Sequence, residues 1–187
     1  MIYEITAATR TVRSFDESRP VTRETILAMI DAARLSPSAM NAQPLRYKIV
    51  TDKETTEKIV SMTKYGAALP ELHLPPEGHH PTAFVAVCTA GNGRFDMFDA
   101  GLACQTMMLR AHEEGVGGVI LASFDPDKLS ELLQLPEGCR PIVVIALGVP
   151  DEKAKIVDVP ESGKTSYYRD ENNVHCVPKR ALEDILL

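Results

Sequence analysis

A basic segment close to the amino end is the first candidate for chemistry in this sequence. It reads Thr9-Arg10-Thr11-Val12-Arg13-Ser14-Phe15. The two guanidinium groups stand three residues apart with hydroxyl side chains around them, and a guanidinium offers a planar fork of donors that suits phosphate. The same spacing is also typical of a solvated basic turn. On its own, the segment therefore leaves an anion site and a plain turn open.

A second polar segment reads Ser36-Pro37-Ser38-Ala39-Met40-Asn41-Ala42-Gln43-Pro44. It offers a hydroxyl, carboxamides and backbone amides within a short span. Because Asn41 and Gln43 each donate and accept hydrogen bonds, the segment can bind a heterocycle with mixed polar edges. A turn whose side chains satisfy their own backbone is the alternative.

Other known catalytic patterns are missing from the sequence. The glycines at 115, 117 and 118 follow an expected helix and precede a strand, whereas a dinucleotide-binding loop needs the opposite order. There is no Gly-x-Ser-x-Gly, phosphate-binding lysine loop or His-Glu-x-x-His. His79-His80 lacks metal-ligand spacing, so we expect no metal site. If the protein is an enzyme, a bound cofactor carries its chemistry, and we name no catalytic side chain.

Composition restricts the partners. The 187 residues carry 20 basic and 26 acidic side chains, a net charge of −6, which argues against nucleic acid. No segment approaches the roughly 20 apolar residues that span a bilayer, and no signal peptide is visible, so we expect a cytoplasmic protein. The four cysteines, at 88, 104, 139 and 176, lack Cys-x-x-Cys spacing, which favours reduced, packed thiols.

Hydrophobic periodicity predicts the elements that position these segments. Helices are expected at 2–9, from an N-cap at Thr22 until Pro37 stops the helix, from Asp52 to 64, at 95–114 and after Asp125-Pro126. Strands are expected at 45–51, 83–89, 119–123 and 141–148. Because residues 100–109 carry no charge, the helix at 95–114 should be buried nearly all round, with the glycines at 115 and 117–118 ending it. The Pro-rich stretch 66–81 is expected to be a surface loop and a candidate lid.

The chain from residue 150 onward is polar, shows no clear period and holds few aliphatic residues before residue 174. Such a segment cannot pack on itself. We expect residues 150–187 to form an arm that wraps a second subunit, and the whole chain, 1–187, to form one domain.

Taken in order, these segments resemble the nitroreductase family of FMN-dependent oxidoreductases. The resemblance rests on the two polar segments above and on further strings that extend it over nearly the whole chain: Asp99-Ala100-Gly101-Leu102-Ala103-Cys104-Gln105, Gly115-Val116-Gly117-Gly118, Phe124-Asp125-Pro126, Leu135-Pro136-Glu137-Gly138 and Val144-Ile145-Ala146-Leu147-Gly148-Val149-Pro150. The second polar segment is its most specific part.

The resemblance implies an α+β fold, with a mixed sheet flanked by helices, and an intertwined homodimer that binds FMN at the subunit interface. The residues that would bind the phosphate and the ring edge are Arg10, Thr11 and Arg13, with added charge from Lys179 and Arg180. The other side of the flavin would be lined, from the same chain or its partner, by Pro37, Ser38, Ala39, Met40, Asn41 and Gln43. Leu121, Ala122 and Ser123 would pass the reactive face, with a backbone amide near Ala122 directed at N5.

The implied activity is hydride transfer from NADH or NADPH through flavin N5 to a small acceptor such as a nitroaromatic, a quinone or an activated alkene, in a ping-pong cycle. Leu45 and Leu121-Ala122-Ser123 depart from the residues common in the family, which leaves the acceptor open. Two alternatives stay open. One is a flavin-binding carrier or sensor without nicotinamide-driven turnover, and the other is an interaction domain without flavin.

Overall fold

The body of the protein is built on a four-stranded sheet. The computed structural model describes residues 2–91 and 93–187. The strands are β1 (Leu45–Val50), β2 (Ala83–Thr89), β3 (Gly117–Leu121) and β4 (Arg140–Gly148), in the order β1-β2-β4-β3. The expected α+β class is confirmed. All strand pairs in this sheet are antiparallel. In addition, Thr11 forms a single parallel bridge with Gly118 of β3.

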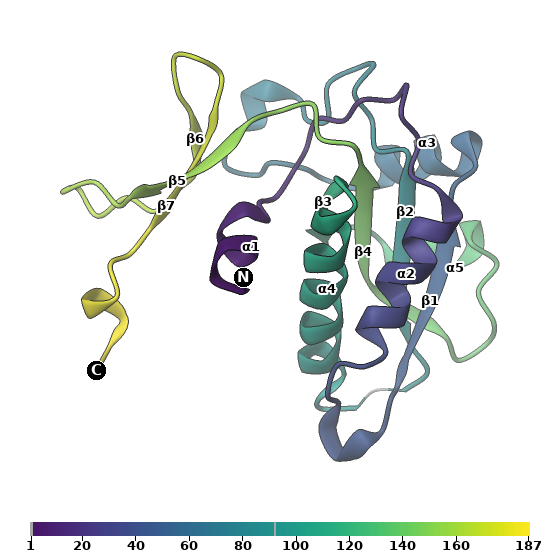
Figure 1. Ribbon diagram of the computed structural model, residues 1–187. Coiled ribbons are helices and arrows are strands. Elements are labelled where there is room, and N and C mark those ends of the chain that lie inside the picture. The colour runs from purple at the N-terminus through teal and green to yellow at the C-terminus, as the bar shows by residue number, and fades with distance from the viewer. Residues whose placement is uncertain (1, 92) are drawn as a thin grey trace.

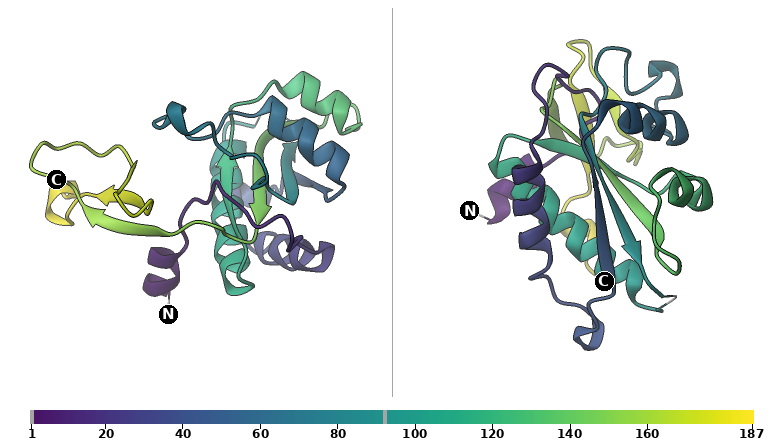
Figure 2. Two further views of the ribbon diagram at one scale, coloured as in Figure 1. Left: turned by 90° about the horizontal axis from the view of Figure 1, so that it is seen from above. Right: turned by 90° about the vertical axis from the view of Figure 1, so that its right-hand side faces the viewer.

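Helices cover both faces of the sheet (Figures 1 and 2). On one face lie α2 (Arg23–Ala33) and α4 (Asp96–Glu113), and on the other lie α3 (Lys53–Met62) and α5 (Pro126–Leu132). Alternate residues of β2 therefore enter two separate hydrophobic clusters: Val85 packs with α2 and α4, and Phe84 with α3 and α5. This double burial explains why β2 is apolar at nearly every position rather than alternating.

Local signals place the helix ends largely as the sequence predicts. The side chains of Thr22, Asp52 and Asp125 accept backbone N–H bonds in the first turns of α2, α3 and α5. Gly115, with φ of +70°, ends α4. Two expectations are wrong: α2 ends at Ala33, before Pro37 can act, and the glycines at 117–118 belong to β3.

The expected all-round burial of α4 is also wrong. One face of the helix packs on the sheet and on α2, but Met97, Phe98 and Leu102 are exposed on the other. Leu102 belongs to the run without charge, and Met97 and Phe98 precede it; together they form an apolar helix face that the described chain leaves uncovered. Among the described residues, no helix is long and apolar enough to cross a membrane.

The carboxyl-terminal arm forms a small sheet of its own, which corrects the expectation of a segment without regular structure. Its strands are β5 (Ala154–Asp158), β6 (Tyr168–Arg169) and β7 (His175–Lys179), in the order β5-β7-β6, followed by the 3-10 turn η3 (Glu183–Ile185). The arm projects from the body on the side where the short helix α1 (Ile2–Ala8) lies (Figures 1 and 2). Its contact with a second subunit remains a prediction.

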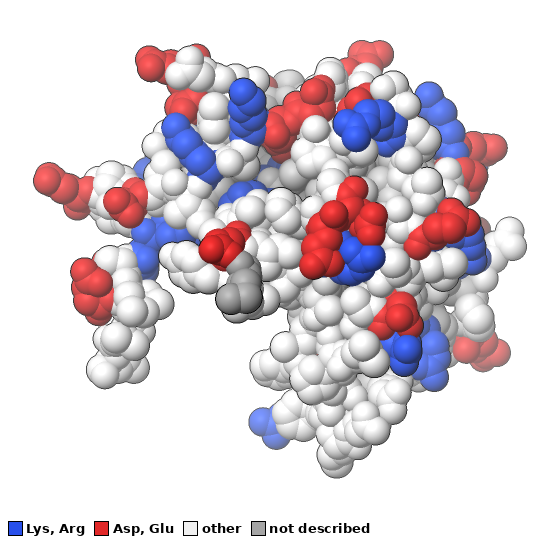
Figure 3. Space-filling model, in the orientation of Figure 1, with Lys and Arg blue, Asp and Glu red and all other residues white. Residues whose placement is uncertain are grey.

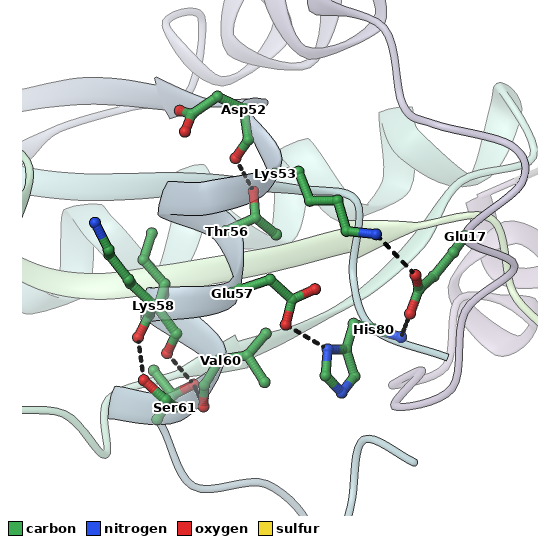
Figure 4. A network of polar contacts seen from close by, with 11 residues as sticks. Glu17, Asp52, Lys53, Thr56, Glu57, Lys58, Val60, Ser61 and His80 are labelled. Carbon is green, nitrogen blue, oxygen red and sulfur yellow. Dashed lines mark hydrogen bonds and ion pairs between the residues drawn. The ribbon is translucent and has the colours of Figure 1, made fainter. Parts of the chain in front are cut away.

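The loop at 66–81 contains the 3-10 turn η2 (Pro70–Leu72) and is fixed at its far end by His80 (Figure 4). The His80 Nδ1 atom lies 2.8 Å from a carboxylate oxygen of Glu57 in α3. The His80 backbone N–H donates to Glu17 at 2.9 Å, and Glu17 lies 4.0 Å from the ammonium of Lys53. These contacts join the loop to α3 and to the amino-terminal segment.

Candidate functional site

The basic segment near the amino end is held between β3 and the chain that leaves β4. The Val12 N–H donates to the carbonyl of Gly118 at 2.9 Å, and the Asp16 N–H donates to the carbonyl of Val149 at 2.9 Å. Because both sides of the segment are fixed by backbone hydrogen bonds, residues 10–13 have a defined position beside the start of β3.

Arg10 has unsatisfied hydrogen-bonding capacity. Its side chain is partly buried, which lowers the pKa of the guanidinium. One terminal nitrogen donates to the carbonyl of Thr6, but the buried Nε atom has no hydrogen-bond partner in the described chain. A buried donor without an acceptor is costly, so this group fits an anionic ligand.

Arg13 lies in a network that the sequence did not reveal. Its guanidinium stacks over the ring of Tyr167, 4.7 Å from the centroid, and its Nη1 donates to Nε2 of His175 at 3.3 Å. Its buried Nε atom has no hydrogen-bond partner within residues 2–91 and 93–187, and burial lowers the pKa of the guanidinium. Arg13 is therefore oriented by the arm of its own chain.

Glu152 joins Arg13 to a second arginine. One carboxylate oxygen accepts the backbone N–H of Arg13, and the other binds the guanidinium of Arg169. The side chains of Glu152 and Arg169 are only 4% and 13% exposed. One largely buried carboxylate thus joins the backbone of Arg13 to the guanidinium of Arg169. No spacing in the sequence distinguishes Glu152 from the other acidic residues of the arm.

His175 is neutral in this network. An arginine only donates, so the His175 Nε2 that faces Arg13 is an acceptor and the ring proton resides on Nδ1. This buried nitrogen has no hydrogen-bond partner among the residues described. Burial, together with the charges of Arg13 and Arg169, lowers the pKa of His175 to about 4. Protonation would break the bond from Arg13 and add a third cation.

This lowered pKa predicts acid sensitivity. The folded state resists protonation of His175 below the ordinary value of 6.5, whereas the unfolded chain accepts the proton. The free energy of unfolding should therefore be highest above pH 6.5 and should fall as the pH drops toward 4. Between pH 7 and pH 5.5 we expect it to fall by roughly 1 kcal/mol. Urea unfolding at both pH values should show a smaller difference for His175→Gln than for the unmodified protein. Equal pH dependence in both proteins would contradict the assignment.

The second polar segment forms an exposed loop with a constrained backbone. It contains the 3-10 turn η1 (Ala39–Asn41), and Met40, Asn41 and Gln43 all have φ near +50°. Side-chain-bearing residues rarely adopt this conformation, and clusters of them are typical of functional loops. Internal bonds hold the shape: the Ser38 hydroxyl accepts the Gln43 N–H at 3.1 Å. Met40 is 94% exposed, so the tip of the loop lies on the surface of the chain.

The structure does not bring the two polar segments together within one chain. The loop binds the beginning of α4, where the Ala39 N–H donates to the carboxylate of Asp99 at 3.1 Å. The basic segment instead pairs with Gly118, which follows the end of α4. From Asp99 to Glu113 the helix rises about 21 Å at 1.5 Å per residue. The predicted halves of the site therefore lie at opposite ends of α4 (Figure 1).

The remaining predicted residues are divided between the body and the arm. Leu121 is buried at the end of β3, while Ala122 and Ser123 are exposed, and the Ser123 hydroxyl donates to the carbonyl of Lys64 at 2.9 Å. Lys179 and Arg180 are exposed at the end of β7. Within the described residues, neither makes a hydrogen bond or an ion pair with Arg10.

A cavity of about 550 Å³ opens between the loop at 66–81 and the arm. Its wall includes Leu72 and Leu74 from the loop, and Glu152 and Arg169 from the buried network. The loop also contacts the arm directly, since the Ala68 N–H donates to the Tyr167 hydroxyl at 3.2 Å. The loop therefore forms one side of this cavity, and its role as a lid stays a prediction.

Comparison with known proteins identifies the family. The chain matches the sequence model of the nitroreductase family over residues 6–74 and 78–149. It is 29% identical to a protein of Methanothermobacter thermautotrophicus named "Putative NADH dehydrogenase/NAD(P)H nitroreductase", over 81% of this chain and 78% of that protein. It is 26% identical to the Bacillus subtilis protein named FMN reductase [NAD(P)H], over 81% of this chain and 67% of that protein.

The fold is also found among solved structures. An iodotyrosine deiodinase bound to FMN and 3-iodo-L-tyrosine superimposes with a TM-score of 0.69 at 24% identity, over 91% of this chain and 96% of that one. This similarity supports the fold, and the family match covers well over half of the sequence. The chain therefore belongs to the nitroreductase family, as the order of its motifs predicted.

Proposed function

We propose that this protein is an FMN-dependent NAD(P)H oxidoreductase that works as a dimer of identical chains, each flavin being bound by residues of both. The observation that carries the proposal is the partly buried guanidinium of Arg10, whose Nε has no acceptor among the described residues. The names of the relatives support FMN as the flavin and NAD(P)H as the electron donor.

The donors near the amino end fit the phosphate of FMN. Arg10 offers an unpaired N–H, and Thr11, beside it, adds a hydroxyl. Charge-assisted bonds from guanidinium groups to phosphate are short and strong. Lys179 and Arg180 lie on the arm whose residues also contact Arg13. They would add positive charge that helps to balance the roughly two negative charges of a phosphate monoester.

A twofold dimer would complete the site. When two copies of α4 pack antiparallel, the end of one helix meets the beginning of the other, so the basic segment of one chain faces the loop at 38–43 of its partner. The apolar face of α4 supports this packing, because Met97, Phe98 and Leu102 are exposed. Figure 3 shows a broad, mostly uncharged surface over α4 and the loop below it. Exposed apolar patches of this kind are typical of interfaces.

Removal of one side chain from this face should weaken the dimer. We expect Leu102→Ala to raise the dimer dissociation constant about tenfold, because truncation of a well-packed interface residue costs more than about 1 kcal/mol. Leu27→Ala is the matched control, since Leu27 on α2 is 47% exposed, the same fraction as Leu102. Sedimentation equilibrium of both variants checks the expectation. Equal dissociation constants would place the interface elsewhere.

The proposed hydride transfer depends on where the chain places Arg13 and the backbone N–H of Ala122 around the flavin. FMN, when bound, supplies two-electron transfer at N5. The guanidinium of Arg13, oriented by Tyr167 and His175, would stabilise the negative charge that the ring gains on reduction. The backbone N–H of Ala122, an exposed residue just after β3, would bind the ring without adding a side-chain acid.

The proposed cycle is ping-pong. NADH or NADPH delivers a hydride and leaves, and an acceptor such as a nitroaromatic, a quinone or an activated alkene then takes the electrons in the same space. One open binding space is enough for both substrates, because they occupy it in turn. The loop at 38–43, held in shape by its internal bonds, would form a wall of that space.

Visible spectroscopy of the purified protein tests the proposal. We expect a yellow protein whose flavin absorbance bleaches on anaerobic addition of NADH or NADPH and returns when an acceptor is added. A flavin that neither nicotinamide reduces would overturn the reductase assignment and leave a flavin-binding protein. A colourless protein that takes up no added FMN would overturn the flavin site as well.

A further inference from the structure

Two cysteines that are distant in the sequence meet where β2 pairs with β4. In this ladder Cys88 lies opposite Pro141, and Thr89 lies opposite Arg140. Cross-strand partners share a face of the sheet, as do residues two positions apart in an extended chain, so Cys139 falls on the face of Cys88. The Cys139 side chain packs against the hydrophobic cluster that contains Cys88, and both cysteines line one pocket.

The pair forms part of the wall of an open pocket. The pocket has a volume of about 440 Å³ and is lined by both cysteines, by Tyr47 and by the turn at 135–139. Cys139 is partly exposed, whereas Cys88 is 1% exposed and belongs to the hydrophobic cluster under α3 and α5. A small solute in the pocket therefore reaches the partly exposed Cys139 before the buried Cys88.

We propose that Cys139 and Cys88 are a peroxide-reactive thiol pair that closes to an intramolecular disulfide. The Cys139 sulfur attacks hydrogen peroxide, the O–O bond breaks, and a sulfenic acid and one water are formed. The Cys88 sulfur then attacks the Cys139 sulfur, an S–S bond forms, the S–O bond breaks, and the departing hydroxide takes the Cys88 proton as a second water. Two thiols are oxidised and one peroxide is reduced to two waters.

The surroundings assign different roles to the two sulfurs. Arg46 and Lys48 line the pocket together with Cys139, and Glu137 is the acidic residue in the same wall. Burial raises the pKa of Cys88 to about 12, so this sulfur stays protonated. Cys139 is thus the group that meets the oxidant, and Cys88 reacts only with an oxidised neighbour.

The position of Cys139 also permits closure. Cys139 lies before the first residue of β4, at the end of a turn in which its N–H donates to the carbonyl of Pro136 at 3.0 Å. A disulfide requires the two Cβ atoms to approach to about 4 Å. Because Cys139 lies in the turn and not in the strand ladder, a movement of the turn can bring its Cβ toward Cys88 while the sheet keeps its register.

Peptide mapping of the oxidised protein tests the proposal. The purified protein is treated with hydrogen peroxide, its remaining thiols are alkylated, and it is digested with trypsin without reductant. Cys88 and Cys139 fall in tryptic peptides 65–94 and 129–153, because the bond between Arg140 and Pro141 resists cleavage. We expect two of the four thiols to be lost, these two peptides to be joined, and dithiothreitol to separate them. Joined peptides from two chains, another cysteine pairing or four retained thiols would overturn the proposal.

Single substitutions separate the two roles without involving the flavin site. Cys139→Ser should leave Cys88 unmodified by peroxide, and Cys88→Ser should leave a sulfenic acid on Cys139 that dimedone traps. Cys104→Ser and Cys176→Ser are the matched controls, since both side chains are buried, in α4 and in β7, and both variants should still lose two thiols. Dimedone labelling of Cys88 in the Cys139→Ser variant would contradict the order of attack. If a variant fails to fold, the peptide map of the unmodified protein still shows whether the Cys88–Cys139 disulfide forms.

Discussion

Replacement of Glu152 by alanine is expected to lower the free energy of unfolding by about 3–5 kcal/mol, the usual cost of removing one partner from a buried ion pair. The Glu152 carboxylate binds the guanidinium of Arg169 and also accepts the backbone N–H of Arg13. Its removal leaves the largely buried guanidinium of Arg169 and the backbone N–H of Arg13 without this acceptor.

Urea unfolding followed by circular dichroism measures the effect. Glu161→Ala is the matched control, since Glu161 is an exposed acidic residue of the same arm, and its loss should change stability by less than about 0.5 kcal/mol. A similar small change for Glu152→Ala would mean that the arm does not depend on this carboxylate. Because the network orients Arg13, the variant should also bind flavin more weakly than the control.

Replacement of Arg10 by alanine is expected to weaken FMN binding about 10- to 100-fold, because a charge-assisted hydrogen bond contributes about 1.5–3 kcal/mol. The apo protein should melt at nearly its usual temperature, since the Arg10 Nε has no hydrogen-bond partner in the part of the chain that the structure describes. Arg10 gives a cleaner test than Arg13, whose stacking on Tyr167 and bond to His175 also support the fold.

Fluorescence titration of the apo protein with FMN provides the dissociation constant, and melting of the apo and holo forms separates binding from folding. Arg19→Ala is the control, because Arg19 is an exposed arginine that the proposed site does not use. If Arg10→Ala lowered the stability of the apo protein as much as it weakened binding, a role at the phosphate would be excluded.

The sequence predicts the body of the fold because each element carries its own local signal. The caps at Thr22, Asp52 and Asp125 start helices in the structure, and the apolar run at 83–89 is the doubly buried strand β2. These signals depend on neighbouring residues, which a single sequence displays directly. The two polar segments were also found, because their residue types are distinctive.

Features that depend on distant contacts could not be predicted. Glu152, Tyr167 and His175 meet Arg13 only after the arm folds back, and no periodicity in the polar arm indicates which acidic or aromatic side chain will be buried. The exposure of the apolar face of α4 was missed for a related reason. An uncharged helix face has the same sequence pattern whether it packs inside its own chain or against another.

The placement of the two polar segments at opposite ends of α4 has a thermodynamic consequence. If neither chain alone holds a complete set of flavin ligands, loading and assembly are linked by mass action. Dilution of the apo protein should then lower its apparent affinity for FMN, and saturating FMN should hold the chains in pairs at concentrations where the apo protein separates.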